Sequence, residues 1–228
     1  WATHGIPNTV NAHPHANAAV ALVHNGIIEN FQPLRAELMS LGHAFETETD
    51  TEVILGLIQE YLNHGMSPQG ATTEMLQRVE GAFALGIIFA GHDDLLIGAR
   101  RGCPLAVGYG DNAMFLGSDS LALAPLTERI SYLEEDDWVE ISRNKASIYN
   151  GIGKKIERPI RVTSRTDSDI GKGNYNHYML KEIYEQPGVI GDCLHSLFNP
   201  VERTVVFPDM SIDFSEISRL SIVACGTS

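Results

Sequence analysis

The stretch AVALVHNGIIENF (residues 19–31) allows two local structures, and the choice between them decides the fold. Small and branched apolar residues precede Asn25-Gly26, and two isoleucines follow it. One interpretation is a tight hairpin, because a type I′ turn needs positive φ at both central residues and Asn-Gly tolerates this best. The other is a strand that brings the Asn25 side-chain amide and the Gly26 backbone N–H to one point, as an oxyanion hole requires.

The composition is that of an ordinary globular protein with an excess of acidic residues. The 228 residues are 43% hydrophobic and 20% charged, enough for one large domain or for one domain and part of another. The net charge of −13 argues against a nucleic-acid partner, because phosphate binding needs clustered Lys and Arg. No apolar run approaches the roughly 20 residues of a membrane span, and no signal-peptide pattern opens the chain. We therefore expect no membrane association and a cytoplasmic location.

The cysteines indicate reduced thiols. Cys103, Cys193 and Cys225 are too few and too scattered for a disulfide framework or a CxxC zinc site. Cys103 precedes a proline and an apolar run, and no histidine stands at a suggestive spacing from it. It is therefore interpreted as a small core residue rather than a nucleophile.

Hydrophobic periodicity predicts helices after the opening stretch. Asn30 is placed to cap a helix that ends at Gly42, where a C-terminal glycine belongs. A short strand is expected near Phe45. Apolar residues of the segment 53–62 then recur at helical spacing, with acidic residues before them that suit the helix dipole. A further helix is expected to begin at Ser67-Pro68.

The second half of the chain changes its pattern. Residues 81–149 read as short strands punctuated by Gly and Asp, which is typical of an antiparallel sheet with tight turns. Residues 158–174 are polar and are expected to form an arm. The segment 177–198 is predicted to be helical with a break at Pro187, and residues 219–228 to be a buried strand that opens into a loop. Helices interposed with antiparallel strands predict a layered α/β or α+β class.

Four histidines near the start of the chain suggest a zinc site. Three imidazoles and a water would make a catalytic zinc centre. However, a proline separates two of the histidines, no HExxH spacing occurs, and no nearby cysteine completes a motif. Hydrogen-bonding histidines in a polar cleft are the favoured interpretation, and no metal is predicted. These histidines are His4, His13, His15 and His24.

Two further positions are candidates for ligand binding. Asp50 is most simply a helix-start residue, and the alternative is a carboxylate held at a helix end to receive a ligand's ammonium group. Gly226-Thr227-Ser228 follows an apolar stretch and is a weak candidate for a phosphate cradle. An ordinary turn between strand and helix explains the same tripeptide.

Six motifs occur together along the chain: WATHG, NAHPH, VHNGIIEN, ETDTEV, HYMLKEIYEQP and ACGTS. HNGIIEN and TDTEV resemble the class II glutamine amidotransferases in general. KEIYEQP followed by ACGTS narrows the resemblance to the glutamine–fructose-6-phosphate aminotransferase (isomerizing) family. The resemblance covers essentially the whole chain.

The resemblance implies an α+β fold in three parts. Residues 1–165 would form a partial glutamine amidotransferase domain, a layered αββα sandwich of the N-terminal-nucleophile type. Residues 166–217 would form an interdomain linker with helices. Residues 218–228 would contain the first strand of an α/β sugar-isomerase domain.

The resemblance also implies an enzyme with two coupled reactions. Its substrates would be glutamine and fructose 6-phosphate, and its products glucosamine 6-phosphate and glutamate. Ammonia released by the glutaminase domain would pass to the isomerase domain, which would bind the sugar. No cofactor is implied, and the full-length enzyme is expected to be a homo-oligomer.

Single residues receive roles from the same resemblance. Asn25 and Gly26 would form the catalytic oxyanion hole for the tetrahedral intermediate of glutamine hydrolysis, and Asp50 would bind the α-ammonium group of glutamine. The remaining positions are a channel gate at Trp1, glutamine-pocket residues at Thr3 and His4, cleft residues without an assigned role at His13 and His24, and the start of the sugar-phosphate site at Thr227 and Ser228.

Three other functions stay open. A different class II amidotransferase, such as the phosphoribosylamine-forming one, would have a different sequence after Ser228. A non-catalytic glutaminase-like binding module need not keep a cysteine at its N-terminus. A zinc-dependent hydrolase using His4, His13 and His24 would contain bound metal.

Both ends of the chain are expected to be cut, because it opens at Trp1 and closes on VACGTS. The family uses an N-terminal cysteine whose thiol attacks the glutamine amide, and an arginine directly before the position of Trp1. Neither residue stands in this sequence. The purified 228-residue chain should therefore release no glutamate from glutamine in an enzyme-coupled glutamate assay. Release above the protein-free blank would contradict this prediction.

Overall fold

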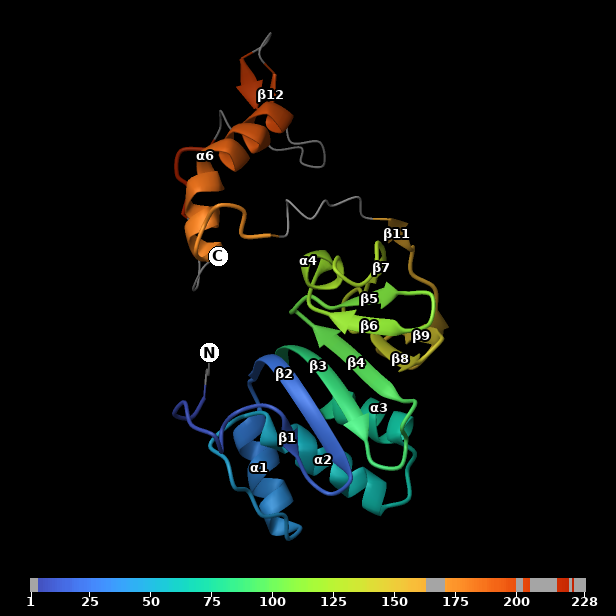
Figure 1. Cartoon of the computed structure of the whole chain (residues 1–228). Helices are drawn as coiled ribbons and strands as arrows, with labels where there is room; N and C mark the ends of the chain where they lie inside the picture. The colour runs from blue at the N-terminus through green and yellow to red at the C-terminus, as the bar shows by residue number, and fades with distance from the viewer. Residues whose placement is uncertain (1–3, 163–170, 200–202, 206–216, 222, 224–228) are drawn as a thin grey trace. The chain divides into compact units, whose positions relative to one another are not determined.

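The computed structural model describes residues 4–162, 171–199, 203–205, 217–221 and 223 (Figure 1). The chain divides into two compact units, Trp1–Ile170 and Gly171–Ser228. The first unit contains two β-sheets and the helices that cover them, and the second contains one long helix and a two-stranded ribbon. The domain bounds expected at residues 165 and 217 stay predictions.

A seven-stranded antiparallel sheet organises the first unit. Strand β2 pairs with β3 along its whole length, from Val20 opposite Phe89 to Ile28 opposite Gly81. Asn25-Gly26 therefore lies inside a strand, and the hairpin interpretation is wrong. The strands, in their order across the sheet, are β1 (His15–Ala16), β2 (Val20–Ile28), β3 (Gly81–Phe89), β4 (Leu96–Arg101), β8 (Trp138–Ser142), β9 (Lys145–Tyr149) and β10 (Lys155–Ile156).

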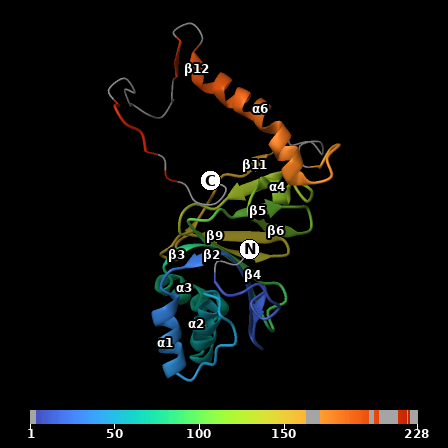
Figure 2. The ribbon, with the colours of Figure 1, turned by 90° about the vertical axis from the view of Figure 1, so that its left-hand side faces the viewer.

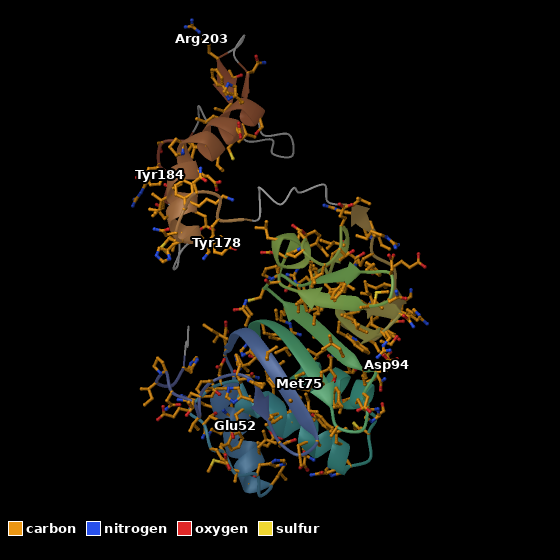
Figure 3. The ribbon with its side chains drawn as sticks, in the orientation of Figure 1. Glu52, Met75, Asp94, Tyr178, Tyr184 and Arg203 are labelled. Atoms are coloured by element: carbon orange, nitrogen blue, oxygen red, sulfur yellow. The ribbon has the colours of Figure 1, made fainter. Side chains whose placement is uncertain are left out.

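Three helices cover one face of this sheet (Figure 2). Alternate residues of β3, including Phe83 and Ile87, point toward them, because successive side chains of a strand face opposite sides. Met75, labelled in Figure 3, is fully buried in this core. Burying each such side chain stabilises the fold by about 1.5–3 kcal/mol. The helices are α1 (Phe31–Ser40), α2 (Glu52–Asn63) and α3 (Pro68–Arg78).

A second, four-stranded sheet packs on the opposite face (Figure 2). Ala84 of β3 and Val107 of the second sheet share its core. The short helix α4 (Ser120–Leu123) covers the outer side through Leu123. The layered arrangement of helices and two sheets confirms the predicted sandwich. The strands are β11 (Arg161–Val162), β7 (Arg129–Tyr132), β5 (Ala106–Tyr109) and β6 (Met114–Gly117).

The predicted helix ends are confirmed, with one difference in how they are held. The Ser67 hydroxyl accepts from Gly70 N (3.2 Å) and caps α3, and Gly42 ends α1 with φ +95°. Asn30 precedes α1, but its side chain makes no cap. It donates to Arg78 O (2.8 Å) and accepts from Glu80 N (3.0 Å). Asn30 therefore ties the start of α1 to the connection between α3 and β3.

The strand expected near Phe45 is absent, since residues 43–47 have no regular structure. The apolar signal at Phe45 has another cause. The Arg35 guanidinium lies 4.6 Å from the centre of the Phe45 ring, and the ring packs at the edge of the helical core. Burial of one aromatic side chain therefore explains the pattern without a strand.

The second unit contains α6 (Tyr178–Leu197), followed by β12 (Phe198–Asn199) and β13 (Thr204–Val205). The break predicted at Pro187 is wrong, because α6 continues through this residue. Proline removes one N–H donor and crowds the carbonyl four residues earlier, but it does not have to end a helix. The described residues 217–221 and 223 are not in a strand, and the rest of the strand expected at 219–228 lies outside the described residues. No described helix has the length and hydropathy needed to cross a membrane.

Gly26 is expected to be required for the β2–β3 pairing. Its φ is +138°, and a Cβ placed there would lie 2.0 Å from Ala82 O. Gly26→Ala should therefore lower the free energy of unfolding by about 3 kcal/mol, from backbone strain and steric overlap together. Gly42→Ala is the matched control, since its φ is +95° but no atom lies within 4 Å of the added Cβ. It should cost about 1 kcal/mol. Urea unfolding measures both, and equal losses would contradict the role of steric overlap.

Candidate active site

A cavity of about 830 Å³ lies in the first unit beside β2. The short strand β1 is antiparallel to β2 and pairs only with Ala21 and Leu22, beginning with His15 opposite Leu22. Beyond Leu22, the edge of β2 that faces away from β3 is therefore left for other groups. The cavity is lined by His4, Ile6, Pro7, Asn8, Thr9, Asn11, Ala12, His13, His24, Asn25, Gly26, Ile27, Glu29, Thr49, Asp50, Thr51, Ala82 and Cys103.

Two side chains bind this edge of β2 on either side of Gly26. His13 Nε2 donates to His24 O at 2.7 Å, and Ile28 N donates to Asp50 Oδ2 at 2.7 Å. Backbone groups of alternate strand residues face the same edge. Gly26 stands midway between His24 and Ile28, so it belongs to the set that faces away from β3. The edge is held at both ends, and Gly26 lies between the two contacts in the cavity wall.

Successive residues of a strand face opposite sides of the sheet, so the Asn25 side chain lies on the other face from those of His24 and Ile28. Asn25 is opposite Ala84 in the β2–β3 register, and Ala84 packs toward the second sheet. Side chains of paired strand residues share one face of a sheet, so Asn25 lies on the face of the second sheet. Asn25 and Gly26, predicted to act together, both line the cavity.

Asp50 is a buried carboxylate at the start of α2. It is 3% exposed, and its Oδ1 atom lies 3.6 Å from His4 Nδ1. The His4 ring meets the Phe31 ring edge to face at a centroid distance of 4.9 Å. Two of the predicted glutamine-pocket residues, His4 and Asp50, therefore lie side by side. Proximity to the first turn of a helix favours a negative charge here.

The loop that carries Asp50 is fixed by Glu52, labelled at the start of α2 in Figure 3. The Glu52 carboxylate accepts from Glu46 N (2.9 Å), Thr47 N (2.8 Å) and Thr47 Oγ1 (2.7 Å). Hydrogen bonds to a charged group are stronger than those between neutral groups. These hydrogen bonds hold the loop that carries Asp50 against the start of α2.

A second set of hydrogen bonds fixes the loop of residues 4–13, which also lines the cavity. Asn11 Nδ2 donates to Ile6 O (3.0 Å) and to Glu48 Oε2 (3.4 Å), and Asn11 Oδ1 accepts from Glu48 N (3.1 Å). Asn11 thus joins the two loops that line the cavity. Sequence reasoning missed Asn11 and Glu48, because no local pattern predicts a contact between residues 37 positions apart.

His24 is buried and neutral. It is 8% exposed, and its Nδ1 atom shares a hydrogen bond with Thr51 Oγ1 at 2.9 Å. Burial lowers the pKa of His24 to about 4, because it disfavours the charged imidazolium, while Asp50 acts in the opposite direction. Burial, followed by the nearby His13, also lowers the pKa of His15. His24 therefore ties β2 to the start of α2 without adding a charge to the core.

The histidines do not form a metal centre within the described part of the chain. There, no group of three or more His, Cys, Asp or Glu side chains is arranged to hold a metal ion. The centre of the His13 ring lies 5.1 Å from that of the His15 ring and 6.4 Å from that of the His24 ring. The zinc-hydrolase alternative thus finds no ligand set among these residues.

Cys103 lies in the cavity wall, which sequence reasoning did not foresee. Burial raises the pKa of its thiol, with a smaller opposing effect from Arg100. The thiol form is therefore favoured over the reactive thiolate. Its packing beside the second core matches the predicted role as a core residue. Trp1, Thr3, Thr227 and Ser228, the other predicted site residues, lie outside the described residues.

Comparisons with known proteins agree on the family of this chain. A family described as "Glutamine amidotransferase domain" matches residues 10–125. Relatives named "Glutamine--fructose-6-phosphate aminotransferase [isomerizing]" match the whole chain. The protein from Zymomonas mobilis is 53% identical over 228 residues, with 38% of its length covered. That from Gluconobacter oxydans is 45% identical over 227 residues, with 37% covered. The chain spans less than two fifths of the length of these curated relatives.

Solved structures support the fold. One, titled glutamine phosphoribosylpyrophosphate amidotransferase from B. subtilis complexed with ADP and GMP, has a TM-score of 0.51. It is 24% identical and covers 61% of this chain and 30% of its own. Another, titled structure of the allosteric regulatory enzyme of purine biosynthesis, has a TM-score of 0.53 and is also 24% identical. It covers 62% of this chain and 31% of its own. At this identity the likeness shows a shared fold.

The lowered pKa of His24 predicts a loss of stability in acid. Unfolded histidine titrates near 6.5 and folded His24 near 4, so between these values the unfolded chain binds the extra proton. The contribution of His24 to the free energy of unfolding is greatest well above pH 6.5. It falls as the pH drops and is about 2 kcal/mol smaller at pH 5. Denaturant unfolding at about pH 7.5 and pH 5 measures the loss.

Two variants isolate the contribution of His24. His24→Asn keeps a polar partner for Thr51 but cannot titrate, so its loss of stability between the two pH values should be about 2 kcal/mol smaller. His64→Asn alters an exposed histidine of similar chemistry and should keep the parental pH dependence. Identical pH dependence in all three proteins would contradict the assignment to His24.

Proposed function

This chain belongs to the glutamine amidotransferase family, and we propose that it carries the glutamine-hydrolysing site of a glutamine–fructose-6-phosphate aminotransferase (isomerizing). Identities of 45–53% along the whole chain with relatives of that name support the proposal. The reaction would convert fructose 6-phosphate and glutamine into glucosamine 6-phosphate and glutamate. A cytoplasmic location and a homo-oligomeric full-length enzyme belong to the same proposal.

The arrangement of Asn25 and Gly26 in the cavity wall carries this proposal. Attack on the glutamine side-chain amide places negative charge on its oxygen in a tetrahedral intermediate. The Asn25 side-chain amide and the Gly26 backbone N–H would donate to that oxygen. Donors held in place before the reaction need no reorganisation as the charge develops. Removing one such donor typically costs about 10²–10³ in kcat, or roughly 3–4 kcal/mol.

Asp50 and His4 would bind the other end of glutamine. A buried carboxylate pays a desolvation penalty that an ammonium group of the ligand would offset. Ile28 N already donates to Asp50 Oδ2, and His4 lies beside Oδ1. This placement fits a pocket in which Asp50 pairs with the α-ammonium group, with Thr3 as a further wall residue.

The attacking thiol would be the N-terminal cysteine that the family uses. In the acyl-transfer step the thiol sulfur bonds to the amide carbon, the C–N bond breaks, and ammonia leaves with the transferred proton. Water then hydrolyses the thioester and releases glutamate. Cys103 is not proposed for this role, because burial raises the pKa of its thiol. Trp1 as a channel gate, and Thr227 and Ser228 as sugar-phosphate residues, complete the proposal.

Asn25→Ala should separate the two half-reactions. In the full-length gene product, the kcat for glutamine hydrolysis should fall about 10²–10³-fold, because one oxyanion donor is lost. Glucosamine 6-phosphate formation from free ammonia should be unchanged, because that route bypasses the glutaminase site. Asn63→Ala, at the exposed end of α2, is the matched control and should keep both activities.

Two outcomes would contradict the proposal in different ways. Equal loss of the glutamine-dependent and ammonia-dependent reactions in Asn25→Ala would remove the oxyanion role of Asn25. Glutamine binding by the unsubstituted full-length protein without glutamate release would favour the non-catalytic binding module instead. Glutamate release and isothermal titration with glutamine distinguish the two.

A further inference from the structure

His13 makes a direct contact with the strand segment that carries the candidate oxyanion donors. Its Nε2 atom lies 2.7 Å from His24 O. A carbonyl oxygen can only accept, so His13 Nε2 must carry the proton of this bond. The bonded carbonyl belongs to the peptide unit whose N–H is that of Asn25. His13 therefore restrains the peptide plane directly before Asn25 and Gly26.

The strand needs such a restraint because its usual neighbour is missing at this point. β1 pairs only with Ala21 and Leu22, so it gives no ladder bonds to the later part of this edge. Gly26 has φ +138°, and glycine is the residue with the largest backbone freedom. A strand edge without ladder bonds and with a glycine at its centre is free to shift unless side chains hold it.

His13 and Asp50 occupy the two ladder positions on either side of Gly26. Asp50 Oδ2 accepts from Ile28 N at 2.7 Å, and His13 donates to His24 O at the same distance. One side chain supplies an acceptor and the other a donor, as a neighbouring strand would. The Asp50 contact has a proposed second purpose in substrate binding. The His13 contact has none so far.

His13 lines the same cavity as His4 and Asp50, and its Nε2 atom contacts the strand backbone at His24 O. His13 is exposed, and its ring meets the His15 ring edge to face at a centroid distance of 5.1 Å, whereas His4 Nδ1 lies 3.6 Å from Asp50 Oδ1. His13 therefore acts on the strand backbone, and its hydrogen bond involves neither His4 nor Asp50.

We propose that His13 is a positioning residue for glutamine hydrolysis. Its Nε2–H holds the His24 carbonyl so that Asn25 and Gly26 present their donors at a fixed place in the cavity. This inference rests on the proposed glutaminase function for its catalytic consequence. Displacement of an oriented group by about 1 Å can cost about 10²-fold in rate, so the His13 contact acts on kcat more than on substrate binding.

Kinetics of the full-length gene product test the catalytic consequence. His13→Ala should lower the kcat for glutamine hydrolysis about 10–100-fold, with the KM for glutamine within about 3-fold of the parent. His13→Gln restores an N–H donor of similar reach and should recover most of the lost kcat. His92→Ala alters an exposed histidine in the turn between β3 and β4 and should match the parent.

Hydrogen exchange gives a readout that does not depend on activity. Mass spectrometry of peptides spanning residues 20–28 should show faster amide exchange in His13→Ala than in the parent, and near-parental exchange in His13→Gln. Peptides from α3 should exchange equally in all variants. This comparison separates a local release of β2 from general unfolding.

The kinetic and exchange results together either support or overturn the role of His13. A kcat loss at near-constant KM, rescued by His13→Gln and accompanied by faster exchange in residues 20–28, supports the inference. Unchanged kcat and exchange in His13→Ala overturn it, as does an increase in KM alone or a loss that His13→Gln fails to rescue. If the unsubstituted protein releases no glutamate, the proposed function fails, and the exchange result alone then decides whether His13 holds the edge of β2.

Discussion

The pairing of β2 with β3 is the constraint on which the rest of the structure depends. The two strands pair along their full length, with Gly26 against Phe83 and Gly81 against Ile28. A Cβ at Gly26 would lie 2.0 Å from Ala82 O, and one at Gly81 would lie 2.2 Å from Ile27 O. Two glycines therefore permit the approach. Once paired, the strands present one apolar face to the three helices and the other to the second sheet.

The candidate site arises where this pairing leaves an edge uncovered. A strand in the middle of a sheet has no backbone groups to offer a ligand, because its neighbours use them. Because β1 pairs only with Ala21 and Leu22, the outer edge of β2 is free of ladder bonds beside the cavity. Side chains of His13 and Asp50 replace the missing ladder on either side of Gly26. This edge of β2 thus forms a wall of the cavity and has side-chain contacts on both sides of Gly26.

The polar groups behind this wall are arranged so that few charges are buried. His24 is kept neutral by its burial and hydrogen-bonds to Thr51, while Asp50 is the buried carboxylate beside the start of α2. Glu52 is half-buried, and its carboxylate accepts hydrogen bonds from the backbone N–H groups of Glu46 and Thr47. A positively charged ligand group would therefore meet a carboxylate whose neighbours are donors or neutral groups. This electrostatic arrangement suits a cationic group better than an anionic one.

The sequence by itself determined the features that depend on short-range patterns. Periodicity located α2 and α3, Ser67 and Gly42 marked helix ends, and the resemblance carried by HNGIIEN and TDTEV pointed to Asn25, Gly26 and Asp50 as one site. Only the tertiary structure decided that Asn25-Gly26 lies in a strand, because a turn and a paired strand tolerate the same dipeptide and the partner strand is more than fifty positions away. The contacts of His13 with His24 and of Asn11 with Glu48 have the same origin. Periodicity reports which side chains are buried, whereas hydrogen bonds between distant segments exist only after packing has brought their partners together.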